Sequence, residues 1–370
     1  MTENCRTFLI CGSGGVGKTT VSAALGVKFA MMGYKTLVLT IDPAKRLATS
    51  LGIEGLADIP QKIELHAHPE AGEMWAMMLD TKRTFDKIVE KYAPSKAQAD
   101  RIYQNPVYSG MSQMLAGTQE YMAMEKLYEI HQTNAYDIIV LDTPPMQNAL
   151  DFLSAPQRMS SLISNSFMSL LMKPAVFASK SGLKLVEFGT KPLVKIFDKI
   201  VGFSFLHDLS EMFILFTELL DGFHSRADNV RQMLTHPDCS FMAVCTTNEH
   251  SISEVNGFYN QLMDYQYHLE KIIVNRVYQG TCYSEEELEM LWDEMEEFCT
   301  ENDSATIIQN YKKYIPLIKN DTAIINSLSD LVGNHNVSTI PLFLSDVHDL
   351  HSLQKVADSI KTEFEFIPPV

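Results

Sequence analysis

The chain has 370 residues, of which 46% are hydrophobic and 21% charged, as in a globular protein with enough apolar material for a core. Its length allows one large α/β domain or two smaller ones. The formal net charge of −16 argues against broad binding to a nucleic-acid backbone, which needs a surface rich in lysine and arginine. We therefore expect no nucleic-acid partner, although a local basic patch is compatible with this charge.

The sequence also gives an expectation about location. The most apolar long run, residues 162–177, contains Asn165 and is interrupted by Lys173 and Pro174, so no segment is expected to span a bilayer. No signal peptide is expected, because the first residues lead directly into an apolar strand. The six cysteines form no Cys-x-x-Cys pair, which favours free buried thiols over a zinc site. We expect a cytoplasmic protein, with peripheral attachment to a membrane as the alternative.

The predicted elements alternate between strands and helices. An apolar run over residues 7–11 predicts a strand that enters a loop, and a helix follows over 21–32 and ends at Gly33. Ser284 and Glu287 match a capping box at the start of an acidic helix. Further apolar strands are predicted at 36–41, 138–141, 241–245, 272–274 and 337–342. This pattern predicts an α/β fold with a mainly parallel sheet covered by helices on both faces, and a ligand site at the carboxyl ends of the strands.

A mostly helical subdomain is predicted at residues 151–237, inserted into a core formed by 1–150 and 238–370. One stripe in it follows the helical period: Leu209, Met212, Phe213, Phe216, Leu219, Leu220 and Phe223. The stripe suits a groove for an apolar client, but packing on its own domain is the simpler interpretation. A basic stretch contains Lys180, Lys184, Lys191, Lys195 and Lys199. It fits an anionic membrane surface, an acidic partner or a solvated helix face.

Residues 12–20 form a glycine-rich loop between the first strand and the first helix, with the pattern Gly12-x-x-x-x-Gly17-Lys18-Thr19. Glycines let successive backbone N–H groups turn toward phosphates, and the helix that follows presents its positive end to them. We expect Lys18 to contact the β- and γ-phosphates and the Thr19 hydroxyl to bind Mg²⁺. The predicted nucleotide-binding residues here are Gly12, Ser13, Gly14, Gly15, Val16, Gly17, Lys18, Thr19 and Thr20.

Two aspartates follow predicted strands at the same edge of the sheet. Asp142 ends an apolar strand, where its carboxylate would hold Mg²⁺ directly or through water, although capping the next helix is the alternative. Asp42 is placed to orient or deprotonate the attacking water, and an N-cap or turn role for Asp42-Pro43 is the alternative. The pattern therefore predicts Mg²⁺-dependent hydrolysis of a nucleotide.

The base is predicted to be adenine. The Asn-Lys-x-Asp segment of guanine-specific P-loop proteins does not occur in the sequence, and Asn275 ends a predicted strand where its amide can donate to and accept from an adenine edge. We therefore expect ATP rather than GTP.

Taken together, these motifs resemble the ArsA-type ATPases, which include arsenite-pump ATPases and the eukaryotic ATPase that targets tail-anchored membrane proteins. The matching segments, in the family's order, are residues 12–20, 40–44, 142–145, 274–276 and 340–343. Residues 119–125 and 142–153 are most similar to the bacterial branch. The resemblance implies roles for five parts of the chain. Asp42 falls at the catalytic position of the first switch loop, Asp142 begins the second switch loop, and Asn275 matches the adenine contact. A loop from Pro341 to Asp346 would close over the base, and Glu249 matches a nucleotide-contacting glutamate of the targeting members.

The departures from the family pattern concern its dimer. The family carries a lysine that reaches the nucleotide of the opposite subunit, and Ser13 stands at that position. Lys45 or Arg46 is a hypothetical substitute for the missing charge. The zinc Cys-x-x-Cys that joins targeting-type dimers is absent after Asn275, and the metalloid-binding cysteines of the pumps have no recognisable counterpart. A homodimer is still the expected assembly.

The sequence thus predicts a Mg²⁺-dependent ATPase that couples ATP binding and hydrolysis to a conformational or dimerisation switch. Three outputs stay open. The first is a carrier of a hydrophobic or membrane-protein client, acting through the helical subdomain. The second is the ATPase subunit of an anion or metalloid efflux pump, and the third is a regulatory or positioning ATPase whose ATP-dependent dimer is itself the signal.

Overall fold

The structure is a computed structural model, and it describes residues 5–42, 44, 46–65, 71–108, 118–143, 208, 211–212, 214–215, 220–296, 298 and 300–361. The chain divides into two compact units. The first unit contains Met1–Met78, Thr133–Gln147 and Thr235–Val370, and the second contains Leu79–Gln132 and Asn148–Leu234. Most of the predicted subdomain, 151–237, falls within the second unit, and its boundaries stay a prediction.

An eight-stranded sheet forms the centre of the first unit, with the strand order β3-β4-β2-β5-β1-β6-β7-β8. All neighbouring strands are parallel except β3 and β4, which confirms the predicted α/β fold with a mainly parallel sheet. The strands are β1 (Arg6–Gly12), β2 (Thr36–Thr40), β3 (Gln61–Ile63), β4 (Met74–Met78), β5 (Ile138–Asp142), β6 (Cys239–Cys245), β7 (Leu269–Val277) and β8 (Val337–Pro341).

The register of the three central strands positions the site. β5 lies between β1 and β2, and Asp142 pairs with Ile10 on one side and with Thr40 on the other. Every residue of β2 and β5 is buried, as expected for continuous apolar strands with both faces covered. The loop after β1, the loop after β2 and the end of β5 therefore meet at one edge of the sheet.

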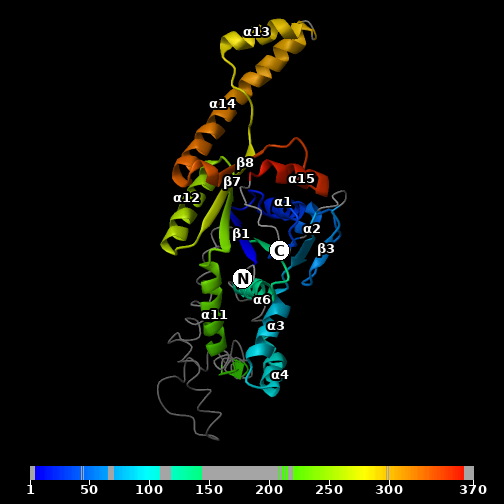
Figure 1. Cartoon of the computed structure of the whole chain (residues 1–370), viewed down its shortest axis with the longest axis vertical. Coiled ribbons are helices and arrows are strands. Elements are labelled where there is room, and N and C mark those ends of the chain that lie inside the picture. The colour runs from blue at the N-terminus through cyan, green and yellow to red at the C-terminus, as the bar shows by residue number, and fades with distance from the viewer. Residues whose placement is uncertain are drawn as a thin grey trace, which may run out of the picture. The chain divides into compact units, whose positions relative to one another are not determined.

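Helices cover both faces of this sheet (Figure 1). On one face, α1 (Lys18–Met31) packs against α15 (Leu350–Ser359), and the rings of Phe8 and Phe29 stack with centroids 5.2 Å apart. On the other face, α12 (Glu249–Asp264) contributes Phe258, whose ring meets Phe241 edge-on at 6.2 Å. Alternate residues of the strands supply the two cores, so α1 is held firmly behind the loop that precedes it.

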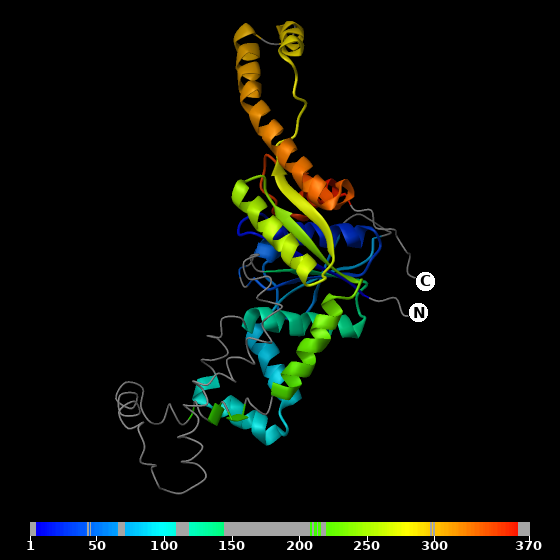
Figure 2. The same ribbon diagram turned by 90° about the vertical axis from the view of Figure 1, so that its left-hand side faces the viewer.

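Between β7 and β8 the chain forms a helical hairpin that projects from the sheet (Figure 2). It consists of α13 (Glu285–Glu296) and α14 (Glu301–Val332), and the short helix η2 (Asn334–Asn336) follows. The predicted capping box is confirmed: the backbone N–H of Ser284 donates to Glu287 Oε2 over 2.7 Å, and the backbone N–H of Glu287 donates to Ser284 Oγ over 3.2 Å. The first unit also contains the short helix α2 (Arg46–Ser50).

The second unit is helical in its described part, with α3 (Thr81–Tyr92), α4 (Lys96–Gln104), α6 (Thr118–Thr133) and α11 (Leu220–Leu234). Arg226 of α11 donates to Glu125 of α6 over 2.8 Å, and its guanidinium lies 3.8 Å from the centre of the Tyr128 ring. From the predicted apolar stripe, Met212 is buried. The side chains of its other members lie outside the described residues, as do the five lysines of the basic stretch.

The cysteines that the structure describes are buried, as predicted, except Cys282, and Cys299 lies outside the described residues. Cys5, Cys11, Cys239 and Cys245 are free and buried, and burial raises the pKa of each thiol. Cys282 is free but exposed, because it lies in the loop that leads into α13. Within the described residues, no helix is both long and apolar enough to cross a membrane.

Gly12 is required by the close approach of β1 and β6. A methyl group there would collide with the carbonyl oxygen of Val244. We expect Gly12→Ala to lower the stability of the protein by about 1–3 kcal/mol, as overpacking at a rigid position does. Thermal unfolding without nucleotide measures this. Gly14→Ala is the matched control, since a methyl group there meets no described atom within 4 Å. Equal melting temperatures for the two variants would contradict this account.

Candidate active site

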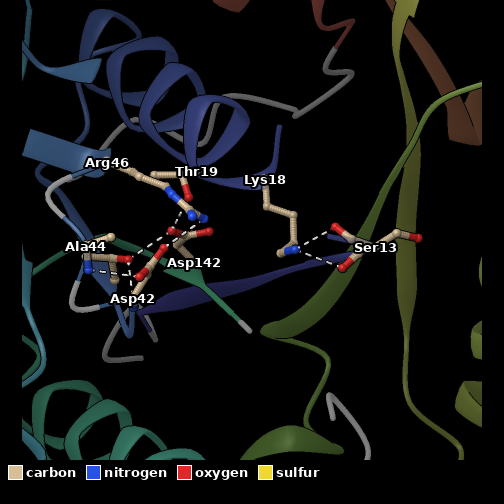
Figure 3. Close-up of polar contacts among 9 residues, drawn as sticks. Ser13, Lys18, Thr19, Asp42, Ala44, Arg46 and Asp142 are labelled. Atoms are coloured by element: carbon tan, nitrogen blue, oxygen red, sulfur yellow. Dashed lines mark hydrogen bonds and ion pairs between the residues drawn. The ribbon is translucent and has the colours of Figure 1, made fainter. Parts of the chain in front are cut away.

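The glycine-rich loop joins β1 to the first turn of α1 (Figure 3). Gly17 has a φ of +98°, which favours glycine, and a side chain there would collide with the amide of Asn275. Lys18 turns its ammonium back onto the loop, where Nζ donates to the carbonyl oxygens of Gly12 over 2.9 Å and Ser13 over 2.8 Å. Burial lowers the pKa of Lys18, and the nearby Asp142 opposes this. The ammonium group of Lys18 is thus partly buried, and its acceptors in the loop are two neutral carbonyl oxygens.

Asp142 is the most buried acid of the site, with 2% of its surface exposed. Its Oδ2 accepts hydrogen bonds from the hydroxyls of Thr19 over 2.8 Å and Thr40 over 2.9 Å. Burial raises the pKa of the Asp142 carboxyl to about 6, although these two hydrogen bonds and the charge of Lys18 lower it. The carboxylate therefore links the start of α1 to the end of β2.

The residues present fit a Mg²⁺ ion. The other carboxylate oxygen of Asp142, Oδ1, is buried and has no hydrogen-bond partner among the described residues. A buried carboxylate oxygen without a partner is costly unless a ligand satisfies it. The Thr19 hydroxyl lies on the same carboxylate, and Mg²⁺ in nucleotide sites is held by few protein oxygens together with phosphates. Within the described chain, no group of three or more histidine, cysteine, aspartate or glutamate side chains is placed to hold a metal ion.

Asp42 follows β2 and points into the same region (Figure 3). Its Oδ1 accepts from the backbone N–H of Ala44 over 2.9 Å, which is the turn geometry that the sequence left open. Its Oδ2 lies 3.1 Å from a guanidinium nitrogen of Arg46, at the start of α2. Asp42 keeps 31% of its side-chain surface exposed, so a water molecule can reach it. Pro43 and Lys45 lie outside the described residues.

Ser13 contacts α12 of its own chain. Its hydroxyl donates to the carboxylate of Glu254, which also lies 3.4 Å from the ring of His250. Ser13 is buried and Glu254 keeps only 15% of its side-chain surface exposed. The second residue of the loop is therefore held by a carboxylate from the helix that follows β6.

Asn275 lies against the loop, because its side-chain amide donates to the carbonyl of Val16 over 2.8 Å. Pro341 ends β8, and the loop beyond it exposes Leu342 and Leu344. Asp346 is exposed in this loop, and Glu249 is exposed in the first turn of α12. The structure thus brings Asn275 to the loop, whereas the base-contact roles of Asn275, Pro341, Asp346 and Glu249 stay predictions.

The sequence missed two contributors, Thr40 and Glu254. Thr40 precedes Ile41-Asp42, and its pairing with Asp142 follows only from the order of strands β2 and β5. Glu254 was overlooked because the family resemblance favoured another acid of the same helix, Glu249. A signal did exist, since Glu254 lies one helical turn after His250 in the helix that follows the predicted strand 241–245.

Most of the chain matches a known protein family. A family model described as anion-transporting ATPase matches residues 5–335. The chain belongs to the ArsA family of ATPases. The matched range contains the glycine-rich loop, Asp42 and Asp142.

Individual relatives are distant. The chain is similar to putative arsenical pump-driving ATPases of Chlorobaculum tepidum, with 28% identity, and of Prosthecochloris vibrioformis, with 29% identity. Each match covers 74% of this chain but only 61% of the relative, so the chain spans about three fifths of their length. It is also similar to the ATPase get3 of Aspergillus niger, with 24% identity over 99% of this chain and 93% of that protein.

The buried charge of Asp142 makes a testable statement about stability. Its pKa is raised from 3.8 to about 6, so between these values the native state holds a proton that the unfolded chain has released. Stability therefore falls as the pH rises through this window. We expect Asp142→Asn to raise the free energy of unfolding of the metal-free protein more at pH 8 than at pH 4, by a difference on the order of 3 kcal/mol, which appears as a larger rise in melting temperature at pH 8.

The matched control is Asp137→Asn, which removes an exposed charge before the same strand. Any pH dependence that both variants share reflects net charge alone. A difference between Asp142→Asn and the wild type that stays constant from pH 4 to pH 8 would show that Asp142 carries no buried-charge penalty.

Proposed function

We propose that this chain hydrolyses Mg·ATP at the loop of residues 12–20 and couples the reaction to a change of conformation or assembly. The observation that carries the proposal is the meeting of Lys18, Thr19, Asp42 and Asp142 at the carboxyl ends of β1, β2 and β5. These are a phosphate-binding cation, two oxygen ligands for a metal and an accessible carboxylate. Membership of an ATPase family supports the same activity.

Lys18 is proposed to exchange its two carbonyl acceptors for phosphate oxygens. Its present hydrogen bonds to Gly12 and Ser13 keep the partly buried ammonium satisfied while no nucleotide is bound. A phosphate group offers a charged acceptor in their place, and charge-assisted hydrogen bonds are the stronger kind. The loop's backbone N–H groups and the positive end of α1 then add to the same field.

Asp42 is proposed to hold the attacking water. The water oxygen forms a bond to the γ-phosphorus while the bond from that phosphorus to the β,γ-bridging oxygen breaks, which gives ADP and inorganic phosphate. The proton leaves the water toward Asp42 and ends on phosphate. When bound beside Thr19 and Asp142, Mg²⁺ neutralises charge on the β- and γ-phosphates. Asn275 and the loop from Pro341 to Asp346, with Glu249 as a weaker candidate, are proposed to contact the nucleotide's base end.

For the biological output, the family supports two proposals. The first, a switch that handles a hydrophobic or membrane-protein client, rests on the resemblance to the targeting members of the family and not on the name of a relative. The second, an efflux-pump ATPase, is supported by the name of the arsenical pump-driving relatives. The four buried cysteines do not favour metalloid binding, because burial keeps them protonated and remote from solvent. A homodimer formed in response to ATP, with no client, is the third proposal.

The catalytic assignment is tested by Asp42→Asn. We expect this variant to bind ATP with nearly wild-type affinity but to lose turnover by about 10²-fold or more, since the amide cannot accept the water's proton. Single-turnover hydrolysis and equilibrium binding of a fluorescent ATP analogue measure the two effects separately. Wild-type turnover in Asp42→Asn would reject the role of Asp42.

The switch is tested by assembly. We expect light scattering of Asp42→Asn, which should retain bound ATP, to show a dimer with Mg·ATP and a smaller dimer fraction with ADP. Lys18→Ala, which should bind phosphates weakly, is expected to stay at its nucleotide-free assembly state. An assembly state that is independent of nucleotide in both variants would contradict an ATP-driven dimer switch. Stimulation of hydrolysis by arsenite would instead favour the pump.

A further inference from the structure

The phosphate end of the site is rich in acids and poor in cations. Asp42, Asp142 and Glu254 contribute carboxylates, and Ser13 contributes no charge. Arg46 is a second cation beside Lys18, and its charge acts on the Lys18 ammonium. A triphosphate would add negative charge directly beside two of the carboxylates, where like charges repel. A Mg²⁺ ion beside Asp142 would offset part of this repulsion, and a cation beside Asp42 would offset more of it.

Arg46 is built to provide that charge. It begins α2, four residues after Asp42, and its guanidinium nitrogen lies 3.1 Å from Asp42 Oδ2. Its charge acts on Lys18 and lowers the pKa of that ammonium, so the two cations lie within electrostatic range of each other. The side chain of Arg46 is 73% exposed, which leaves most of its donors free of protein contacts and free to turn. Figure 3 shows it extending from α2 toward the residues of the loop.

We propose that Arg46 is a second catalytic cation, which contacts the γ-phosphate from the same chain while it holds Asp42. A guanidinium has donors on several edges, so one edge can pair with the Asp42 carboxylate and another with a phosphate oxygen. Charge that develops on the transferred phosphoryl group is then met by a cation that the site itself has positioned. This inference rests on the proposed ATPase function and deepens it.

The surroundings of Ser13 support action within one chain. The Ser13 hydroxyl is occupied by Glu254, and both side chains are largely buried. This part of the loop thus presents no cation to a neighbouring subunit. Arg46, in contrast, is joined through Asp42 to the end of β2 in the same sheet as the loop. Arg46 and the glycine-rich loop therefore both follow strands of the same sheet in the same chain.

The first test compares Arg46→Ala and Arg46→Lys with the wild type. We expect Arg46→Ala to lower single-turnover hydrolysis by about 10²-fold, the usual effect of losing one charged donor to a transition state. Arg46→Lys should restore part of the rate, because it keeps the charge but loses the fork. Arg101→Ala is the matched control, since it breaks a comparably exposed ion pair, with Glu211, in the second unit. Wild-type turnover in Arg46→Ala would overturn the proposal.

A second measurement separates contact with phosphate from mere positioning of Asp42. Binding of Mg·ADP with aluminium fluoride, which mimics the transferred phosphoryl group, is measured in wild type, Arg46→Ala, Asp42→Asn and the double variant. We expect Arg46→Ala to weaken this complex by about tenfold or more even when Asp42 is already Asn, and to leave the affinity for ADP nearly unchanged. If Arg46→Ala has no effect in the Asp42→Asn background, Arg46 acts only through Asp42 and the proposal fails.

Mixing variants tests whether the arginine acts within one chain. Arg46→Ala keeps a complete loop, and Lys18→Ala keeps Arg46. We expect an equimolar mixture to hydrolyse ATP no faster than the two variants separately. Recovery of activity in the mixture would show that Arg46 acts across subunits. Loss of turnover in Asp42→Asn with full turnover in Arg46→Ala would reject this inference alone. Full turnover in both variants would also reject the role of Asp42, and a wild-type protein that does not hydrolyse ATP would reject the proposed function itself.

Discussion

The site depends on one buried carboxylate. Asp142 ends the strand that lies between the two strands leading to the other functional loops, and its Oδ2 accepts hydrogen bonds from Thr19 and Thr40. A buried charge of this kind is unfavourable unless it is fully satisfied, and Oδ1 has no partner among the described residues. A cation bound at this edge of the sheet, where a nucleotide's metal would lie, would therefore stabilise the Asp142 carboxylate.

The Asp142 carboxylate explains why the neighbouring residues are polar in an otherwise apolar region. Thr40 is buried at the end of a strand whose other positions are apolar or packed, and its hydroxyl donates to Asp142 and accepts from the backbone N–H of Asp42 over 3.2 Å. Lys18 satisfies itself on two carbonyl groups of its own loop rather than on the carboxylate. Charged groups that are held apart lower the stability of the free protein. They are then already in position when a ligand binds, as is common in binding sites.

The sequence was sufficient to predict the sheet core, because continuous apolar strands are local signals. It also singled out Lys18, Thr19, Asp42 and Asp142, which the structure brings together, although their roles stay proposals. It did not predict β3 and β4, since Gln61 and Lys62 are exposed edge residues and Met74–Met78 is too short for its periodicity to separate a strand from a helix. It also could not find the Ser13–Glu254 contact, which joins residues 241 positions apart. The sequence left open whether Lys45 or Arg46 supplies charge. The structure places Arg46 at the start of α2, where it forms an ion pair with Asp42.

The central claim is that the unmet charge of Asp142 marks a Mg·ATP site. A crystal structure of the chain with Mg²⁺ and a non-hydrolysable ATP analogue tests it most directly. We expect Lys18 to leave the carbonyl oxygens of Gly12 and Ser13 for the phosphates, and the metal to lie beside Thr19 and Oδ1 of Asp142. A nucleotide bound elsewhere, or bound with Lys18 still on those carbonyls and no metal near Asp142, would contradict the account.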